Sequence, residues 1–307
     1  MTRPFGGLLA VHAHPDDETL ATGALLATWA SSGRPVTVVT CTRGERGEVI
    51  PADLAHLAGD GPALANHREG ELARALTALG VADHVFLDQV VVPGEPPRRF
   101  ADSGMVWVAP GAAGQPTDVP DDAFVAVPVD VAARRLAAVI SDRRPDVVVG
   151  YEPGGGYGHP DHVHAHRVVE RAVRLASEAG SHVVPVVLWA AQDEAELATG
   201  CREVVALAEP PLVPLDPERD LPSAAVSADL IDVSVDIVPV IERVVAALRA
   251  HATQVQAVRA WSGTGLAAGH FALSDGVLQP LLRTEGYRFA GGWVRRTVNW
   301  PVGVRVA

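Results

Sequence analysis

The chain has 307 residues, of which 48% are hydrophobic, and 25 Lys and Arg against 37 Asp and Glu give it a formal net charge of −12. This length suits one large α/β domain or a core with a smaller appendage, and the negative charge disfavours nucleic-acid partners, because phosphate binding requires an excess of basic side chains. No apolar stretch reaches the roughly 20 residues of a membrane span, and a start without a signal-peptide pattern together with only two cysteines predicts a cytoplasmic protein.

The first half of the sequence alternates strand patterns with helix patterns. Short runs rich in Val, Leu and Thr predict strands that are buried on both faces, and the Ala/Leu-rich or amphipathic segments between them predict helices. In chain order the strands are expected over residues 7–13, 35–42, 84–88, 146–151 and 183–191, and the helices over residues 17–32, 65–79, 129–143 and 160–178. Such alternation predicts an α/β fold with a Rossmann-like, mostly parallel sheet flanked by helices.

The pattern weakens in the last third of the chain. Five prolines between residues 192 and 233 favour loops and short strands, residues 235–251 have a helical pattern, and residues 285–307 look β-rich. We therefore predict a Rossmann-like core over residues 1–190. A smaller C-terminal α+β part over residues 191–307 would complete the substrate pocket within one continuous fold.

One connection is unusually long. Residues 90–128 hold many Pro and Gly and little periodicity, whereas a typical connection has about 4–6 residues. A loop of this length at the ligand edge of a sheet favours a functional wall or lid over a site.

Two short runs carry most of the chemistry in the sequence. Residues 14–17 are His-Pro-Asp-Asp, and residues 159–162 are His-Pro-Asp-His. Each run follows an apolar strand pattern and leads into a helix pattern, so both are expected at the carboxyl edge of the sheet, where ligands bind. Together they offer two imidazoles and one carboxylate for a divalent metal, with a spare carboxylate for proton transfer. This is the inventory of a metal-assisted hydrolase.

In the first run, His14 and Asp17 are expected to converge on one ion. Asp17 would lie at the start of a helix, where the helix dipole favours an ionised carboxylate. The alternative is that Asp16 or Asp17 merely caps the helix, as Asp often does. The preceding His14 and the following Glu18 favour the metal site.

In the second run, four histidines occur within residues 159–166. His162 would fall in the first turn of a helix and point at the same spot as His14. A rival pairing joins His162 and His166, which are four residues apart on one helical face. His164 lies on another face and is expected to be solvated.

The remaining polar residues of the two runs supply the rest of a hydrolytic site. Asp16 would act as general base toward a metal-bound water. His159, if cationic, would stabilise the oxyanion or protonate the leaving amine, and Tyr157 in its glycine-rich lead-in would polarise the carbonyl. A surface tyrosine on a simple turn is the alternative for Tyr157. Asp161 would orient a histidine ligand from behind.

Residues 13–18 (Ala-His-Pro-Asp-Asp-Glu) and residues 158–162 (Gly-His-Pro-Asp-His) resemble the LmbE-like, or PIG-L, N-deacetylase family. Members of that family have a Rossmann-like core and use a metal to hydrolyse N-acetyl groups on amino sugars. The resemblance covers nearly the whole chain for the branch that deacetylates N-acetyl-glucosaminyl-inositol in mycothiol biosynthesis. Further resembling segments are residues 39–42, 44–50, 68–80, 102–105, 155–159 and 251–255.

The resemblance implies a role for each matching residue. The metal would be bound by His14, Asp17 and His162, with Asp16 as the base and His159 and Tyr157 at the transition state. Arg68 and Asp102 are similar to residues that hold the sugar and inositol hydroxyls, and Met105 lines the same pocket. Asp161 and Glu48 would lie one layer behind the ligands. For His251 and Gln254 the sequence leaves open whether they form a pocket wall or a structural helix end.

The expected reaction is therefore hydrolysis of the acetamide of 1-D-myo-inositol 2-acetamido-2-deoxy-α-D-glucopyranoside. One divalent metal is expected, Zn²⁺ or alternatively Fe²⁺, because two histidines and one carboxylate suit both. The expected partner is a small N-acetylated amino-sugar glycoside, and the sequence leaves open whether the protein forms a homo-oligomer. Alternatives are a mycothiol S-conjugate amidase, a deacetylase of an N-acetylglucosaminyl antibiotic intermediate, or a non-catalytic sugar-binding Rossmann module. The last is disfavoured because the whole catalytic set is present and no Gly-x-Gly-x-x-Gly follows the first strand.

Overall fold

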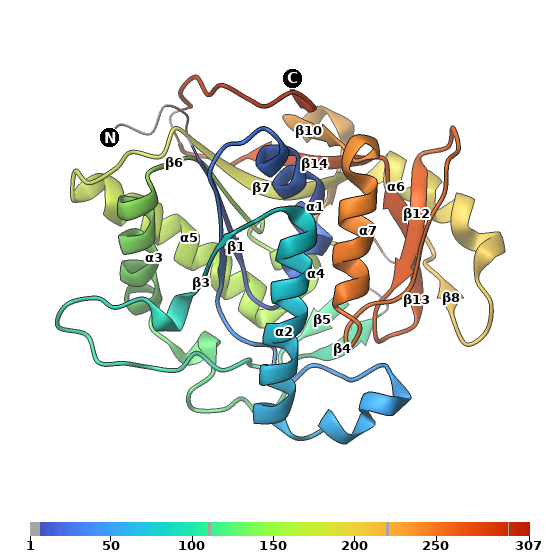
Figure 1. Ribbon diagram of the computed structural model, residues 1–307, viewed down its shortest axis with the longest axis horizontal. Helices are drawn as coiled ribbons and strands as arrows, with labels where there is room; N and C mark the ends of the chain where they lie inside the picture. Colours follow the sequence, from blue (N-terminus) through green and yellow to red (C-terminus); the bar gives the residue numbers. More distant parts are fainter. Residues whose placement is uncertain (1–6, 110–111, 219–220, 294) are drawn as a thin grey trace.

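A large mixed sheet runs through the centre of the protein, whose computed structural model describes residues 7–109, 112–218, 221–293 and 295–307 (Figure 1). In spatial order its strands are β15 (Val304–Val306), β10 (Val233–Asp236), β14 (Thr284–Phe289), β7 (Val186–Asp193), β6 (Pro145–Gly150), β1 (Gly7–His12), β2 (Val36–Thr40) and β3 (Asp83–Phe86), and β9 (Ala225–Val226) pairs with β7. The strands from β7 to β3 are parallel, whereas β14, β10 and β15 extend the sheet in antiparallel fashion.

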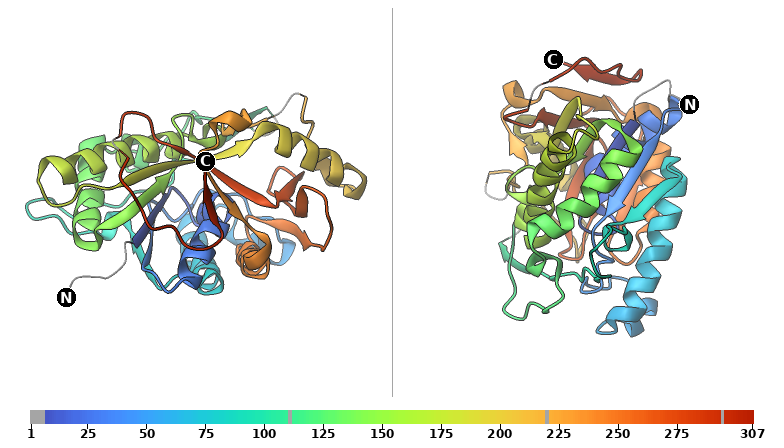
Figure 2. Two further views of the ribbon diagram at one scale, coloured as in Figure 1. Left: turned by 90° about the horizontal axis from the view of Figure 1, so that it is seen from above. Right: turned by 90° about the vertical axis from the view of Figure 1, so that its left-hand side faces the viewer.

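Helices cover both faces of this sheet, so that its central strands are buried on each side (Figure 2). One face carries α1 (Asp17–Ser31), α2 (Gly61–Leu79) and α7 (Ile241–Ala250), and the other carries α3 (Val129–Arg143) and α5 (Pro160–Glu178). Along β1, Leu8 and Ala10 join the first of these cores, and Leu9 and Val11 join the second. A strand that is apolar at every position is what a sheet buried on both faces requires.

A smaller sheet packs beside the large one. It consists of β11 (Gln256–Ala260), β12 (Ala267–Ala272), β13 (Val277–Leu282) and β8 (Val213–Pro214), in that order, and α6 (Glu194–Val204) lies against β12 and β13. The other short elements are the hairpin strands β4 (Val106–Ala109) and β5 (Ala112–Gly114), the one-turn α4 (Gly155–Gly158), and 3-10 turns at Ala52–Leu57, Leu87–Gln89, Phe124–Ala126, Val205–Leu207, Ala228–Leu230 and Val238–Val240.

The structure confirms the predicted fold class and the alternation of strands and helices in the first half, with element ends shifted by a few residues. It differs in the second half. Residues 194–204 form α6 where loops and short strands were expected, and its start is capped by Asp193, whose side chain accepts from the N–H groups of Ala195 and Glu196. The antiparallel strands within residues 256–282 had no counterpart in the predicted elements.

Two further differences concern helix starts and the long connection. Helix α2 begins at Gly61, because Asp60 caps it by accepting from the backbone N–H of Ala63. The connection over residues 90–128 contains the β4–β5 hairpin, and its Phe100 and Phe124 are fully buried in the core beneath α3 and α5. Part of this segment is therefore packed against the core and forms a wall.

The topology indicates where a ligand can bind. From β1 the chain order runs outward through β2 and β3 on one side and through β6 and β7 on the other. Carboxyl ends of strands at such a switch point border a crevice, because the helices that follow them turn to opposite faces. Both His-Pro-Asp runs follow these strands, the first after β1 and the second after β6 and α4. In the part of the chain that the structure describes, no helix has the length and apolarity to span a membrane.

Candidate metal-dependent active site

The two His-Pro-Asp runs meet at the carboxyl edge of β1 and β6. His14 lies in the turn after β1, and Asp17 is the first residue of α1, where its Oδ2 also accepts from the backbone N–H of His14 at 2.9 Å. His162 comes from the first turn of α5. All three side chains are buried.

The donor atoms of these three residues form an equilateral triangle. His14 Nδ1, Asp17 Oδ2 and His162 Nε2 are each 3.3 Å from the other two. Ligand atoms about 2.0–2.1 Å from a tetrahedral ion lie roughly 3.3–3.4 Å apart. The triangle therefore fits three corners of a tetrahedral metal and leaves the fourth corner open, as catalytic sites require.

Hydrogen bonds from behind orient both imidazoles. His162 Nδ1 lies 3.0 Å from the carbonyl oxygen of Gly155, and His14 Nε2 lies 3.2 Å from Asp161 Oδ2. Each of these nitrogens donates to an oxygen, so the lone pair of the other nitrogen faces the triangle. Burial alone would raise the pKa of Asp17, but His162 and His14 hold it well below its ordinary value.

A second group of donor atoms lies next to the triangle. Atoms of His14, Asp102, His159 and Asp161 lie within 4.8 Å of one another, as do atoms of His14, His159 and His162. The donor atoms of these groups are already used, however. His159 Nδ1 accepts a hydrogen bond from the backbone N–H of Asp161 at 3.1 Å, and Asp161 Oδ2 accepts hydrogen bonds from His14 Nε2 and from the backbone N–H of Ser103. The triangle is the better metal site because its three lone pairs all point inward.

Asp16 lies beside the triangle on a backbone that non-glycine residues rarely adopt, with φ 123°. Such a conformation persists only where its surroundings hold it, and it is concentrated at functional sites. Here the backbone N–H of Asp16 donates to Glu18 Oε2 at 2.9 Å, and Asp16 Oδ2 lies 3.3 Å from Arg68 Nη2. Burial raises the pKa of Asp16 to about 6, against the opposing effect of Arg68.

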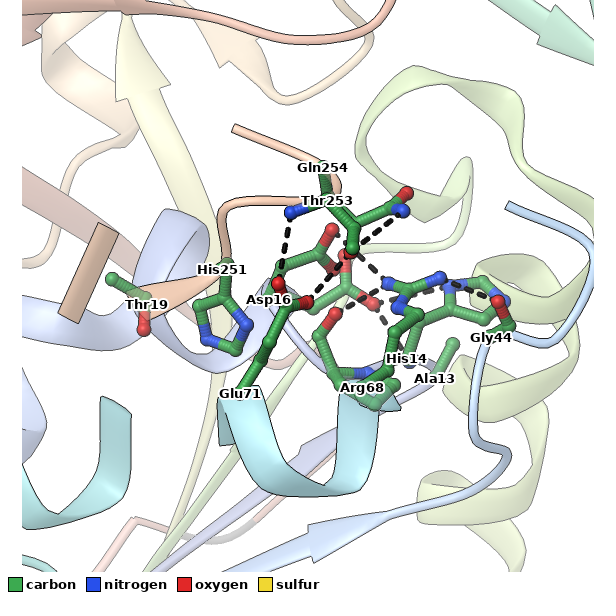
Figure 3. A network of polar contacts seen from close by, with 12 residues as sticks. Ala13, His14, Asp16, Thr19, Gly44, Arg68, Glu71, His251, Thr253 and Gln254 are labelled. Carbon is green, nitrogen blue, oxygen red and sulfur yellow. Dashed lines mark hydrogen bonds and ion pairs between the residues drawn. The ribbon is translucent and has the colours of Figure 1, made fainter. Parts of the chain in front are cut away.

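Arg68 of α2 lies between Asp16 and Gly44 (Figure 3). Its Nη1 donates to the carbonyl of Gly44 at 2.6 Å and its Nη2 to the carbonyl of Pro15 at 2.5 Å. A Cβ at Gly44, which has φ +64°, would lie 2.0 Å from Nη1, and a Cβ at Gly47 would lie 2.7 Å from it. The two glycines are therefore needed for the guanidinium to pass.

A buried ion pair supports the same turn from the C-terminal part of the chain. His251, at the end of α7, places Nε2 2.8 Å from Glu18 Oε1, and both side chains are fully buried. Although burial opposes both charges, the contact raises the pKa of His251 and lowers that of Glu18 to about 2. Nearby, Thr253 donates to Glu71 of α2 from both its N–H and its hydroxyl (Figure 3). His251 is thus a structural support rather than a pocket wall.

His159 and Tyr157 face the ligands from the glycine-rich turn before α5. The ring of His159 stacks on His162 with centroids 4.9 Å apart, and Tyr157 meets His162 edge-on at 5.0 Å. Burial, reinforced by His14 and His162, lowers the pKa of His159 well below its ordinary value. Burial and the carboxylate of Asp17 raise the pKa of Tyr157. Both side chains are therefore neutral in this site.

The conformation of that turn depends on Glu152. Its carboxylate accepts from the N–H groups of Gly154 and Gly156 and from the hydroxyl of Ser223, and Gly156 has φ +80°. These bonds hold an irregular backbone that would otherwise leave polar groups unpaired. The orientation of Tyr157 is set by this support.

Among the residues expected to contact substrate, Asp102 lies next to His14, with Asp102 Oδ1 3.5 Å from His14 Nε2. Asp102 is 3% exposed, and it accepts from the N–H groups of Gly104 and Arg46. Met105 is partly exposed just before β4. Glu48 is exposed, and it is its carbonyl oxygen that accepts from Gln254. The structure thus brings Asp161, but not the carboxylate of Glu48, behind the ligands.

The structure corrects the expectations for the later histidines. His164 is buried, and its ring meets Phe124 edge-on at 4.7 Å, so it is not solvated. His166 Nδ1 lies 2.9 Å from the carbonyl of Tyr151, and its ring packs against Trp189. His162 therefore pairs with His14, and the rival pairing with His166 is not formed.

Tyr151 and Glu18 support the site in ways that the sequence did not predict. Tyr151 follows β6, stacks on His162 with centroids 4.2 Å apart, and accepts from the N–H of Ala13 at 2.9 Å. Glu18 Oε2 accepts a hydrogen bond from the backbone N–H of Asp16. The sequence does contain a signal for each residue. Tyr151 comes directly after a buried strand, and Glu18 comes directly after two aspartates.

Comparison with known proteins agrees with this geometry. Residues 9–173 match the PIG-L family model, described as GlcNAc-PI de-N-acetylase. A protein of Kineococcus radiotolerans named 1D-myo-inositol 2-acetamido-2-deoxy-alpha-D-glucopyranoside deacetylase is 44% identical over 93% of this chain and 77% of its own length. A protein of Nocardia farcinica with the same name is 42% identical over 99% of this chain and 95% of its own length.

Solved structures share the fold at lower identity. The 4-carboxy-2-hydroxymuconate hydratase GalB of Pseudomonas putida is 16% identical, with a TM-score of 0.53 over 96% of this chain and all of its own. This similarity concerns the fold alone, because its named reaction is a hydration. The matched family model covers both His-Pro-Asp runs, and the relatives match at more than 40% identity over nearly the whole chain. The chain belongs to the PIG-L family of de-N-acetylases.

Proposed function

We propose that this protein hydrolyses the acetamide of 1-D-myo-inositol 2-acetamido-2-deoxy-α-D-glucopyranoside to the free amine and acetate, a step of mycothiol biosynthesis. The observation that carries the proposal is the 3.3 Å triangle of His14, Asp17 and His162 with the separate carboxylate of Asp16 beside it. The names of the Kineococcus and Nocardia relatives support this substrate.

The triangle would hold one divalent ion, and we propose Zn²⁺. Two imidazole nitrogens and one carboxylate oxygen at tetrahedral spacing form a set that zinc accepts. When bound, such an ion polarises an amide carbonyl and makes a coordinated water more acidic. The chain orients the ligands for it through Asp161 behind His14 and Gly155 behind His162.

Asp16 is proposed as the general base. Its pKa of about 6 leaves it ionised at neutral pH, yet close enough to the working pH to accept a proton from the attacking water. Arg68 and Glu18 hold its carboxylate and backbone in place. The carboxylate therefore does not have to reorient when the proton moves.

His159 and Tyr157 are proposed to donate hydrogen bonds to the oxygen of the scissile amide. His159 Nδ1 accepts from the N–H of Asp161, so the ring proton of the neutral imidazole is on Nε2. The raised pKa of Tyr157 keeps its phenol protonated and able to donate. In this proposal His159 acts as a neutral donor to developing negative charge, in place of the cationic role considered from the sequence.

Arg68, Asp102 and Met105 are proposed to border the sugar-binding side. A polyol requires charged and hydrogen-bonding side chains around it. Arg68 Nε is buried and has no hydrogen-bond partner in the described structure. Arg68 also holds Asp16, so we propose that it links binding of the sugar to placement of the base.

The proposal is tested by measuring released amine with metal-loaded enzyme on two substrates, the acetamide above and a mycothiol S-conjugate. We expect the higher kcat/KM for the acetamide. Faster cleavage of the S-conjugate would assign the protein to amidase function instead. A metal-free sample prepared with chelator serves as the control and should release amine from neither substrate.

A further inference from the structure

A cavity of about 210 Å³ opens beside the metal triangle. Asp17, His162 and Tyr157 form its wall toward the site, and it extends between α1, the β7–β14 region of the large sheet and the small sheet. Away from the ligands its walls are mainly apolar side chains, among them Leu20, Ala21, Ala190, Ile237, Phe271 and Leu281. The cavity is therefore part of the active site but differs from its polar side.

The two glutamates in the cavity wall are already used within the protein, whereas Trp107 Nε1 in the same wall has no hydrogen-bond partner in the described structure. Glu152 accepts from Gly154, Gly156 and Ser223. Glu285 accepts from the N–H groups of Ala24 and Leu25 and from the hydroxyl of Tyr287. A polyol placed against the apolar part of the wall, formed by residues such as Leu20, Ile237 and Phe271, would leave hydroxyls poorly paired, which is unfavourable for buried polar groups. An apolar ligand group would have no such penalty.

The two sides of the triangle thus differ in the chemistry that they match. Arg68, Asp102 and Asp16 are not part of the cavity lining, and they provide charged groups near the triangle, where Asp16 pairs with Arg68 and Asp102 Oδ1 lies 3.5 Å from His14 Nε2. The substrate has its polyol on the amine side of the amide and its only apolar group on the acyl side. Polarity therefore directs the acyl group toward the cavity.

The cavity is much larger than an acetyl group needs. A methyl group takes up roughly the ~30 Å³ of one water molecule, whereas an apolar cavity of about 150 Å³ accommodates benzene. A cavity of about 210 Å³ has room for an aliphatic chain of roughly six carbons.

We propose that this protein also hydrolyses N-acyl amino-sugar glycosides whose acyl chain has up to about six carbons, and that the chain lies in this cavity. The inference rests on the proposed function, because it uses the same amide cleavage. One water adds to the carbonyl carbon, the C–N bond breaks, the nitrogen takes up a proton, and the products are the free amine and the fatty carboxylate.

The test is an acyl-length series on one amine. Glucosaminyl-inositol carrying acetyl, butanoyl, hexanoyl or decanoyl groups is assayed for released amine with the metal-loaded enzyme. We expect kcat/KM to rise through hexanoyl, by up to about fourfold for each methylene that becomes buried, and to fall for decanoyl, which exceeds the cavity. A hexanoyl substrate with a lower kcat/KM than the acetyl substrate would overturn the inference.

Variants that fill the cavity locate the acyl site. Ala190→Leu narrows it from β7 and Ala21→Leu narrows it from α1. Each should lower the ratio of hexanoyl to acetyl kcat/KM at least tenfold. Ala138→Leu, on the exposed face of α3, is the matched control and should leave the ratio unchanged. Metal content and the thermal midpoint verify that each variant is folded.

The outcomes separate this inference from the proposed function. An unchanged ratio in both folded cavity variants would place the chain elsewhere and overturn the inference. Acetamide cleavage without hexanamide cleavage would refute the inference and leave the deacetylase proposal standing. Hexanamide cleavage without acetamide cleavage would refute the deacetylase proposal instead.

Discussion

The two His-Pro-Asp runs have similar sequences, but their aspartates have different surroundings, because α1 and α5 begin at different points within the runs. In the first run α1 begins at Asp17, so His14 and Asp17 both face the metal position and Asp16 stays outside the helix with φ 123°. In the second run α5 begins at Pro160. A proline fits the first helical position because its missing N–H has no partner there.

The later helix start in the first run frees a carboxylate, whereas the earlier start in the second run buries one. Asp16 is free for proton transfer beside the metal position. Asp161 is fully buried and is hydrogen-bonded to His14 and to the N–H of Ser103. His159 becomes the cap of α5, since its Nδ1 accepts from the N–H of Asp161. A difference of two residues in where the helix begins therefore separates the proposed base, Asp16, from a supporting carboxylate, Asp161.

The largest effect should come from removing a ligand. His162→Ala is expected to weaken metal binding more than about 100-fold and to abolish activity, because a tetrahedral site loses one of its three protein donors. Metal content after dialysis against a weak chelator measures it. His166→Ala, four residues along the same helix, is the matched control. Equal metal loss in both variants would show that the rival pair had been the site.

Asp16→Ala tests the free carboxylate of the first run. We expect kcat to fall about 10²- to 10⁴-fold with KM and metal content nearly unchanged, since a general base contributes about that much. Steady-state kinetics together with metal analysis measure it. Full activity in Asp16→Ala would mean that another group takes the proton.

Asp161→Asn tests the buried carboxylate of the second run. The amide occupies the same volume but accepts less strongly from His14, so metal affinity should fall about 10- to 100-fold. Adding excess metal should restore most of the activity. This rescue distinguishes Asp161 from Asp16, and a kcat defect that persists at saturating metal would contradict the assigned difference.

Glu18→Gln tests the support of Asp16. A glutamine has one acceptor oxygen in place of two, so the bond to Asp16 N–H or the pair with His251 is weakened. We expect roughly a tenfold lower kcat with unchanged metal content, and a larger loss for Glu18→Ala. Glu178→Gln, an exposed position at the end of α5, serves as the control. A change in KM alone would argue against a role in placing the base.

The pH dependence should show a single acidic limb from the same carboxylate. The pKa of Asp16 is raised to about 6, so the ionised base is lost as the pH falls through that value. Log kcat should then decrease by about one per pH unit below about 6. Because the pKa of His159 is lowered well below its ordinary value, its protonation should add no limb near neutrality. The pH profile of Asp16→Glu, which retains a carboxylate, provides the comparison.

The convergence of His14, Asp17 and His162 could be predicted from the sequence because each belongs to a local motif. A helix start fixes the direction of Asp17 and His162, and a buried strand fixes the place of His14. The supports were harder to predict because they depend on contacts between distant parts of the chain. His251 is hydrogen-bonded to Glu18, which lies 233 positions away in the sequence. Nothing in the sequence near residue 251 indicates that partner.

The fold of the second half of the chain was also harder to predict from the sequence. In α6 the cap at Asp193 and the apolar residues Leu197, Cys201 and Val204 carry a helical signal over only eleven residues, directly before a proline-rich stretch. Strand β12 reads Ala-Ala-Gly-His-Phe-Ala and has no β-branched residues, so it lacks the usual strand signal. It forms a strand because it pairs with β11 and β13.

The proposed function requires that one divalent ion binds between the two runs at the 3.3 Å triangle. Anomalous diffraction at the zinc absorption edge from crystals of the zinc-loaded protein tests it directly. We expect one peak about 2.0–2.2 Å from His14 Nδ1, Asp17 Oδ2 and His162 Nε2, with Asp16 outside the ligand set. A peak instead among His159, Asp102 and Asp161 would contradict it.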